Sequence, residues 1–117
     1  MKRVRDAHWL PLAGLSLGDL PRLGNVGAAY MFRDALTEEL LYIGSTDCLR
    51  RRLFGNHLGG VGGATTQRVN GLLLHRNRVA RVQVAWFVTR EWKRLEDVLK
   101  AEFRAEHDYS LPPGTLR

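Results

Sequence analysis

The sequence has few of the features that mark secreted, membrane-spanning or zinc-clustered proteins. It contains one cysteine, Cys48, in 117 residues, which excludes an internal disulfide and a zinc site built from clustered cysteines. No run approaches the ~18 to 20 consecutive apolar residues of a transmembrane helix, and no long apolar stretch follows the basic start, as one does in a secretory signal. We therefore expect a soluble, cytoplasmic protein that folds as a single domain over residues 1–117.

Acidic residues are absent from the middle of the chain. Residues 48–90 contain eight arginines and no Asp or Glu, whereas residues 91–108 contain six acids and four bases. Lysine is also scarce, because 15 of the 18 basic residues are arginines. The planar guanidinium group of arginine binds phosphate through paired hydrogen bonds and stacks on bases. With a net charge of +6, the pattern indicates a phosphate-binding middle segment followed by an acidic helix.

Several enzyme motifs are missing as well. The glycine-rich stretch 59–63 is not followed by the Lys-Ser/Thr pair that a P-loop requires. The four histidines are scattered and do not have the spacing of metal ligands. Serine or cysteine triads and dinucleotide-binding fingerprints are not recognisable.

The apolar pattern predicts two strands, two helices, a strand and a final helix. Their ranges are 28–33, 40–44, about 48–57, 65–74, 79–88 and 90–107. This ββααβα order predicts an α+β fold with a small three-stranded antiparallel sheet flanked by helices. We expect residues 1–26 to be an N-terminal extension with a short helical turn at Asp19, residues 27–108 to form the core, and residues 109–117 to form a tail.

Two tyrosines stand in the predicted hairpin. If the register pairs Tyr30 with Tyr42, both phenols emerge on the same face of the sheet, because strand side chains alternate between faces. Two tyrosines in a sheet are also consistent with ordinary packing, so the pair alone does not define a site.

The helix after the hairpin carries three consecutive arginines. At 100° per residue, with Leu49 and Leu53 buried, Arg52 flanks the buried edge and can reach over the sheet face. Arg51 is predicted to point into solvent, and Arg50 lies on the other flank. On the last helix Glu96 and Glu102 flank the apolar stripe on opposite sides, and spacing alone does not choose between them. Ser45 is predicted to cap the helix that follows it.

These residues together resemble the GIY-YIG nuclease family, as a stand-alone catalytic domain. The resemblance spans residues 27–108, and its first motif is degenerate, with two alanines before the tyrosine. The matching segments are Ala28-Ala29-Tyr30, Tyr42-Ile43-Gly44-Ser45-Thr46, Leu49-Arg50-Arg51-Arg52-Leu53 with His57, and Leu95-Glu96.

The resemblance implies a DNA endonuclease that hydrolyses phosphodiester bonds with one divalent cation, Mg²⁺ or Mn²⁺. Glu96 would hold the metal, and Arg52 would clamp the scissile phosphate. Tyr30 would take the proton of the attacking water, with Arg52 and the metal making its phenol more acidic, and Tyr42 would position water or phosphate. His57 stands one residue beyond the place where relatives have a histidine or tyrosine, and Asp108 stands near a place where asparagine is common.

The expected partner is duplex or single-stranded DNA, with no membrane, and specificity would come from loops, from a homodimer or from a partner protein. The glycine loop at 58–63 and the arginines around it are predicted to follow the DNA backbone. The predicted nucleic-acid-binding residues are Arg50, Gly60, Arg68, Arg76 and Arg78. The alternative function is a nucleic-acid-binding module that has the same fold but no catalysis.

Overall fold

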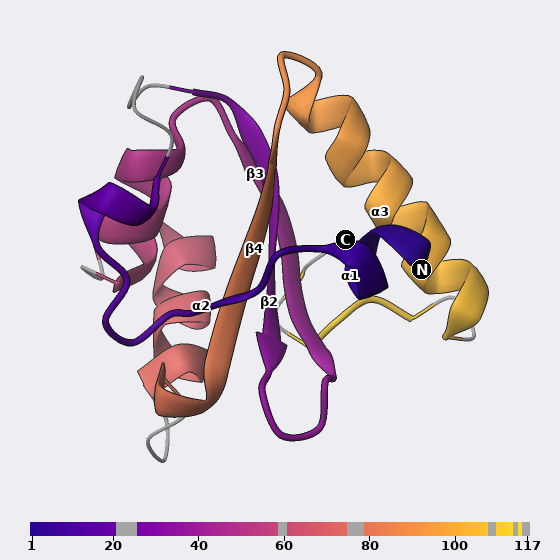
Figure 1. Cartoon of the computed structure of the whole chain (residues 1–117), viewed down its shortest axis with the longest axis horizontal. Coiled ribbons are helices and arrows are strands. Elements are labelled where there is room, and N and C mark those ends of the chain that lie inside the picture. Colours follow the sequence, from indigo (N-terminus) through magenta and orange to yellow (C-terminus); the bar gives the residue numbers. More distant parts are fainter. Residues whose placement is uncertain (21–25, 59–60, 75–78, 108–109, 114, 116–117) are drawn as a thin grey trace.

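The computed structural model describes the chain except for residues 21–25, 59–60, 75–78, 108–109, 114 and 116–117. The predicted order of the core elements is confirmed, and three short elements precede the core (Figure 1). In chain order the elements are α1 (Lys2–Asp6), β1 (Leu10–Pro11), η1 (Leu17–Asp19), β2 (Ala28–Asp34), β3 (Leu40–Thr46), η2 (Arg51–Leu58), α2 (Ala64–Leu74), β4 (Val82–Val88) and α3 (Trp92–Glu106).

The sheet has four antiparallel strands in the order β1-β4-β2-β3. The α+β prediction is confirmed, but the prediction of three strands is wrong. The fourth strand is β1, in which Leu10 and Pro11 pair with Val84 and Gln83 of β4. Two residues are too few to show an alternating pattern, and proline is tolerated because β1 lies at the edge of the sheet. A 3₁₀ turn, η1, ends at Asp19, where the helical turn was expected to begin, and residues 21–25 lie outside the described residues.

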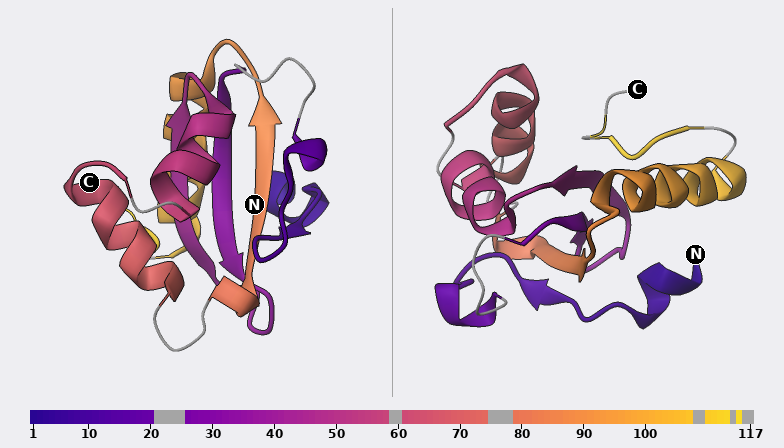
Figure 2. Two further views of the ribbon diagram at one scale, coloured as in Figure 1. Left: turned by 90° about the vertical axis from the view of Figure 1, so that its left-hand side faces the viewer. Right: turned by 90° about the horizontal axis from the view of Figure 1, so that it is seen from above.

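Helices cover both faces of the sheet. Figure 2 shows η2 and α2 on one face and α3 with α1 on the other. Because both faces are covered, the first five residues of β2 and of β3 are all buried, which explains their nearly continuous apolar sequences. Within the described ranges, no helix has the length and apolarity needed to cross a bilayer.

The core is divided by the sheet into two clusters. The cluster under η2 and α2 includes Tyr30, Phe32, Tyr42, Leu53 and Val69. The cluster under α3 includes Met31, Ile43, Leu99 and Phe103. Tyr30 and Tyr42 therefore lie on the face of the sheet that is covered by η2, the helix that carries Arg52.

The segment after β3 is helical as predicted, but Arg51–Leu58 form a π-helix instead of an α-helix. Gly55 in its middle lowers the preference for an α-helix. Leu53 and His57 are the buried residues of η2, and both face the cluster that contains the tyrosines. π-Helical segments are uncommon and often occur at functional sites.

The chain after α3 returns to the outer edge of the sheet (Figure 2). There the backbone N–H of Ile43 donates a hydrogen bond of 2.9 Å to Oγ1 of Thr115, a buried residue. This contact satisfies one donor of β3, which is an edge strand. It also brings the C-terminal segment beside the candidate site.

Candidate active site

Tyr30 and Tyr42 lie on the same face of the sheet, as predicted, but they are not direct partners. Tyr30 of β2 pairs with Gly44 of β3, and Phe32 pairs with Tyr42. The two tyrosines are therefore diagonal neighbours, with ring centroids 5.8 Å apart. Residues two positions apart on a strand share a face, so this offset keeps both phenols on the arginine side.

Gly44 makes the space that the Tyr30 ring occupies. A Cβ atom at position 44 would lie 2.9 Å from both Cζ and the hydroxyl oxygen of Tyr30, and 2.5 Å from Cε1 of Tyr42. Both rings are packed in the core and cannot move aside freely. The glycine therefore lets the Tyr30 phenol lie across β3.

We expect Gly44→Ala to destabilise the fold by about 1–3 kcal/mol, because the added methyl group overpacks the two tyrosine rings. Urea denaturation measures this change. Gly71→Ala is the control, because Gly71 lies in α2 and a Cβ added there would have no atom within 4 Å. Alanine at that position should stabilise the helix by about 0.5–1 kcal/mol. Equal stability of Gly44→Ala and the parent protein would contradict this account.

His57 contacts both tyrosines. Its Nε2 lies 2.6 Å from the hydroxyl oxygen of Tyr30, and its side chain is fully buried. Asn56, which occupies the nearer position in the sequence, instead donates a hydrogen bond to the carbonyl of Val61. Burial and, secondarily, the charge of Arg52 lower the pKa of His57 to about 4. His57 is therefore neutral at pH 7 and can accept the Tyr30 proton when its own proton is on Nδ1.

This low pKa makes the stability of the protein depend on pH. The unfolded chain, with a histidine pKa near ~6.5, binds more protons than the folded chain between pH 6.5 and 4, so stability is lost as the pH falls through that range. We expect a loss of about 2 kcal/mol at pH 5 relative to pH 7.5. His57→Gln retains an acceptor for Tyr30 but does not titrate, and urea denaturation at both pH values should show a smaller loss. If the parent protein and His57→Gln lost the same stability between pH 7.5 and pH 5, the pH dependence would not arise from His57.

The pKa values of both phenols lie above their usual value, so both tyrosines are expected to be protonated at neutral pH. Burial raises the pKa of Tyr30 well above its usual value, the neighbouring Tyr42 raises it further, and the charge of Arg52 lowers it only in part. Burial also raises the pKa of Tyr42. Arg52 therefore lowers the pKa of Tyr30, as expected, but burial raises that pKa by more. Any transfer of a proton to Tyr30 requires that its own proton move to an acceptor such as His57.

Arg52 and Arg51 point in the directions that the helical phase predicted. Arg51 is exposed and forms an ion pair of 2.7 Å with Asp47. Arg52 is half-buried, and its charge acts on Tyr30, Tyr42 and His57. Its Nε is buried and has no hydrogen-bond partner among the described residues. A guanidinium with a buried, unused donor beside two phenols is suited to bind a phosphate.

Glu96 faces this site, and Glu102 does not. Glu96 is buried, and its Oε1 accepts a hydrogen bond of 2.5 Å from the hydroxyl of Ser45. Glu102 instead forms an ion pair of 2.8 Å with Arg3. The prediction that Ser45 caps the next helix is not what the structure shows, since Thr46 Oγ1 accepts the hydrogen bond from the backbone N–H of Cys48.

Two lysines that the sequence patterns did not single out surround Glu96. Lys100 Nζ lies 2.6 Å and Lys93 Nζ lies 3.1 Å from its Oε2. Burial raises the pKa of Glu96, but hydrogen bonds from Lys100, Ser45 and Lys93 outweigh it, and the pKa lies below its usual value. The spacing of the lysines, three before and four after the glutamate, is a helical pairing signal that was present in the sequence.

A cavity of about 380 Å³ connects the carboxylate to the tyrosine side of the sheet. It combines cations, hydroxyl groups and one carboxylate, a set suited to a phosphate together with a cation. Its lining residues are Tyr42, Ile43, Thr65, Arg68, Lys93, Glu96, Lys100 and Thr115. No sequence signal indicated Thr115, which reaches the cavity through the fold of the C-terminal segment.

The oxygen donors here fit a hard divalent cation that keeps most of its waters. Glu96 and Ser45 supply a carboxylate and a hydroxyl beside the cavity, and Mg²⁺ is commonly held by one or two carboxylates with water and phosphate oxygens. In the described part of the chain, no three His, Cys, Asp or Glu residues cluster as a metal cage. The residues do not fit a structural zinc or calcium site.

The predicted DNA-binding residues are placed only in part. Arg50 is exposed, and Arg68 of α2 lines the cavity. Gly60, Arg76 and Arg78 lie outside the described residues, as does Asp108. Arg81, another arginine of the acid-free segment, forms an ion pair of 2.9 Å with Asp34, so its acidic partner comes from the hairpin.

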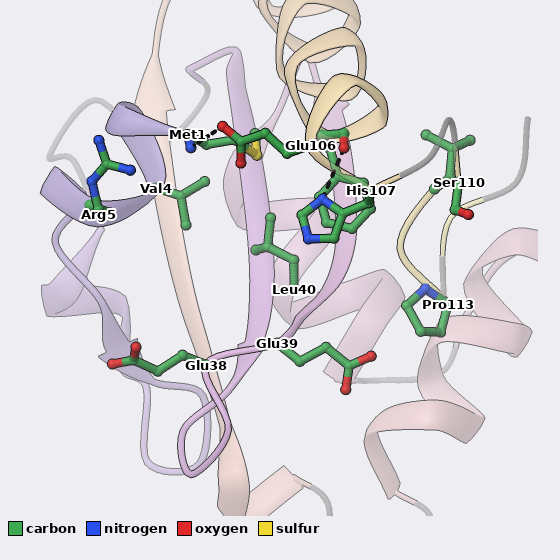
Figure 3. Close-up of a pocket in the computed structure, with 12 residues that line it drawn as sticks. Met1, Val4, Arg5, Glu38, Glu39, Leu40, Glu106, His107, Ser110 and Pro113 are labelled. Carbon is green, nitrogen blue, oxygen red and sulfur yellow. Dashed lines mark hydrogen bonds and ion pairs between the residues drawn. The ribbon is translucent and has the colours of Figure 1, made fainter.

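A larger cavity, of about 630 Å³, lies elsewhere and contains none of the predicted site residues. It is bordered by α1, the β2–β3 turn and the end of α3, where the N-terminal amine pairs with Glu106 (Figure 3). This cavity is therefore separate from the place where the tyrosines, Arg52, His57 and Glu96 lie.

The fold and these side chains define the class of protein. The family model described as the GIY-YIG catalytic domain matches residues 26–109, most of the chain. The chain therefore belongs to the GIY-YIG family and carries a nuclease-type catalytic domain. Comparisons with curated proteins and with solved structures find no match.

Proposed function

We propose that this protein is a DNA endonuclease that hydrolyses phosphodiester bonds and depends on Mg²⁺ or Mn²⁺. The observation that carries the proposal is that Tyr30, Tyr42 and His57 are in contact on one sheet face, where the charge of Arg52 acts on all three, and that Glu96 lies at the adjoining edge. These residues come from four separate elements, β2, β3, η2 and α3. Family membership supports the same reaction class.

Arg52 binds the scissile phosphate in this proposal. Its Nε is buried without a partner among the described residues, so a phosphate oxygen would satisfy a donor that the fold leaves unused. In a half-buried site the guanidinium would also offset the charge that grows on the phosphate in the transition state.

Tyr30 and His57 handle the proton of the attacking water. As the water oxygen forms the new bond to phosphorus, the phosphorus–oxygen bond to the leaving strand end breaks, and the leaving oxygen takes up a proton from solvent. The proton of the attacking water passes to the Tyr30 oxygen, and the Tyr30 proton moves along the 2.6 Å contact to Nε2 of His57. A bound phosphate would counter the charge of Arg52, which is one of the two causes of the low His57 pKa. Substrate binding would therefore make His57 a better acceptor. Tyr42, on the cavity side, orients water or phosphate.

Glu96, with Ser45 beside it, would hold the divalent cation. When bound, such a cation supplies positive charge that stabilises the leaving oxygen. Glu96 contributes a carboxylate that is ionised at neutral pH, because its pKa lies below the usual value.

Purified protein with plasmid and labelled single strands, in Mg²⁺, Mn²⁺ or EDTA, tests the function. We expect cleavage with either metal and none in EDTA. DNA binding without cleavage under every condition would instead support the catalytically inactive binding module. Duplex, single-stranded and branched substrates in the same assay would separate restriction, repair and mobile-element roles.

Arg68 is proposed to contact the DNA backbone beside the site. It lines the cavity, and its charge acts on Tyr42. We expect Arg68→Ala to weaken DNA binding for all sequences and to reduce the log–log salt slope by about 0.9 on duplex. Fluorescence anisotropy at several salt concentrations measures both. Arg81→Ala, at an arginine paired with Asp34, is the control, and equal slopes for the two variants would contradict the assignment.

A further inference from the structure

Glu96 is held between two lysines of its own helix. Lys93 stands three residues before it and Lys100 four residues after it, so all three side chains share one face of α3. Both ammonium groups donate to the same oxygen, Oε2, at 3.1 and 2.6 Å, while Ser45 donates to Oε1. Each oxygen of the carboxylate therefore already has a donor from the protein.

The two lysines differ in how firmly they are held. The Lys93 side chain is 64 % exposed and also reaches Asp97 at 3.8 Å, whereas the Lys100 side chain is only 17 % exposed. Lys100 also makes the shorter contact. It lines the cavity beside Tyr42 and Arg68, where water can compete less well for its ammonium group. Lys100 is therefore the main counter-ion of Glu96, and Lys93 is a surface partner.

A divalent cation and the Lys100 ammonium cannot use the same carboxylate oxygen at once. Both are positively charged, and their repulsion is strong in a cavity that is partly shielded from water. An ion that binds Glu96 through Oε2 must therefore move the Lys100 ammonium away from that oxygen.

We propose that Lys100 is a built-in competitor of the metal, which neutralises Glu96 when no divalent cation is bound and is displaced when one binds. This inference rests on the proposed function, because it takes Glu96 as the metal ligand. Lys100 would therefore control the affinity of Glu96 for the metal. Once displaced, its ammonium group would remain in the cavity lined by Tyr42 and Arg68.

Mn²⁺ binding measured by calorimetry, without DNA, tests the inference. Lys100→Met removes the charge but keeps most of the side-chain volume, and we expect it to bind Mn²⁺ about tenfold more tightly than the parent protein. Lys93→Met changes the net charge by the same amount and is the matched control, with an expected change below about threefold because its group is exposed. If Lys100→Met does not fold, Lys100→Gln gives the same test with a neutral donor.

Equal Mn²⁺ affinities for the parent and Lys100→Met would overturn the inference. Equal gains in both methionine variants would also overturn it, because the effect would then be general electrostatics and not competition for one oxygen. Lack of Mn²⁺ binding in the parent and in Lys100→Met would overturn it together with the metal assignment. A protein that binds Mn²⁺ as expected but cuts no DNA would support the inference and contradict the proposed endonuclease activity.

Discussion

Glu96→Ala is expected to abolish DNA cleavage, with a loss of at least ~10³-fold in the single-turnover rate. The substitution removes the only carboxylate in the cavity lining that the structure describes, and a metal's stabilisation of the leaving oxygen is worth several kcal/mol. DNA binding should survive or tighten, because Lys93 and Lys100 lose the anion that they now neutralise. Gel-based cleavage and anisotropy measure the two effects on one preparation.

Glu102→Ala is the control for this prediction. Glu102 lies on the same helix but forms its ion pair with Arg3 on the other side. Cleavage at nearly the parent rate by Glu96→Ala, with loss in Glu102→Ala, would show that the wrong carboxylate has been assigned.

Arg52→Lys should lower the cleavage rate by about 10²- to 10³-fold while the protein stays folded. Lysine keeps the positive charge but has no planar pair of donors, and the loss of one preorganised donor to a transition-state oxygen has effects of this size. Thermal melting checks the fold, and single-turnover cleavage checks the rate.

Arg51→Lys provides the comparison. Its side chain is exposed and pairs with Asp47, so the rate should change little. If Arg51→Lys lost activity and Arg52→Lys did not, the orientation of η2 toward the sheet would be wrong.

The sequence was sufficient for those parts of the fold in which one pattern dominates. The alternation of apolar residues predicted a strand over 79–88, which the structure places at Val82–Val88. The apolar stripe of α3 predicted the last helix, because it buries a regular face. Strand β1 could not be predicted, since two residues carry no period and its pairing depends on β4. The π-helical form of η2 also depends on packing, because Leu53 and His57 must both reach the core.

The candidate site was predicted best where side-chain direction follows from local structure. The shared face of Tyr30 and Tyr42 and the opposite directions of Arg51 and Arg52 follow from strand and helix periods. The helix period did not decide between Glu96 and Glu102, because both flank the same apolar stripe. Only the position of α3 against β3 distinguishes the two carboxylates. The structure places Glu96 beside Ser45 and in the lining of the cavity, and its role as the metal ligand stays a prediction.

Some interactions depend on long-range contacts that no short pattern contains. Ser45 looked like a helix cap because it precedes a helix, but its hydroxyl reaches a residue 51 positions away. The contact of Thr115 with Ile43 spans 72 positions. The high pKa of Tyr30 arises mainly from its burial, which becomes known only once η2 is placed over the sheet.

The central claim is that Tyr30 and Glu96 act in one catalytic site on a phosphodiester bond. Single-turnover cleavage of labelled DNA in Mg²⁺ by the parent, Tyr30→Phe, Glu96→Gln and the double variant tests it most directly. We predict that the parent protein cleaves the DNA and that each single variant loses at least ~10²-fold in rate. The double variant should be no slower than the slower single variant, because the effects of groups that act as a unit are not additive. Absence of cleavage by the parent, or losses that multiply in the double variant, would contradict the claim.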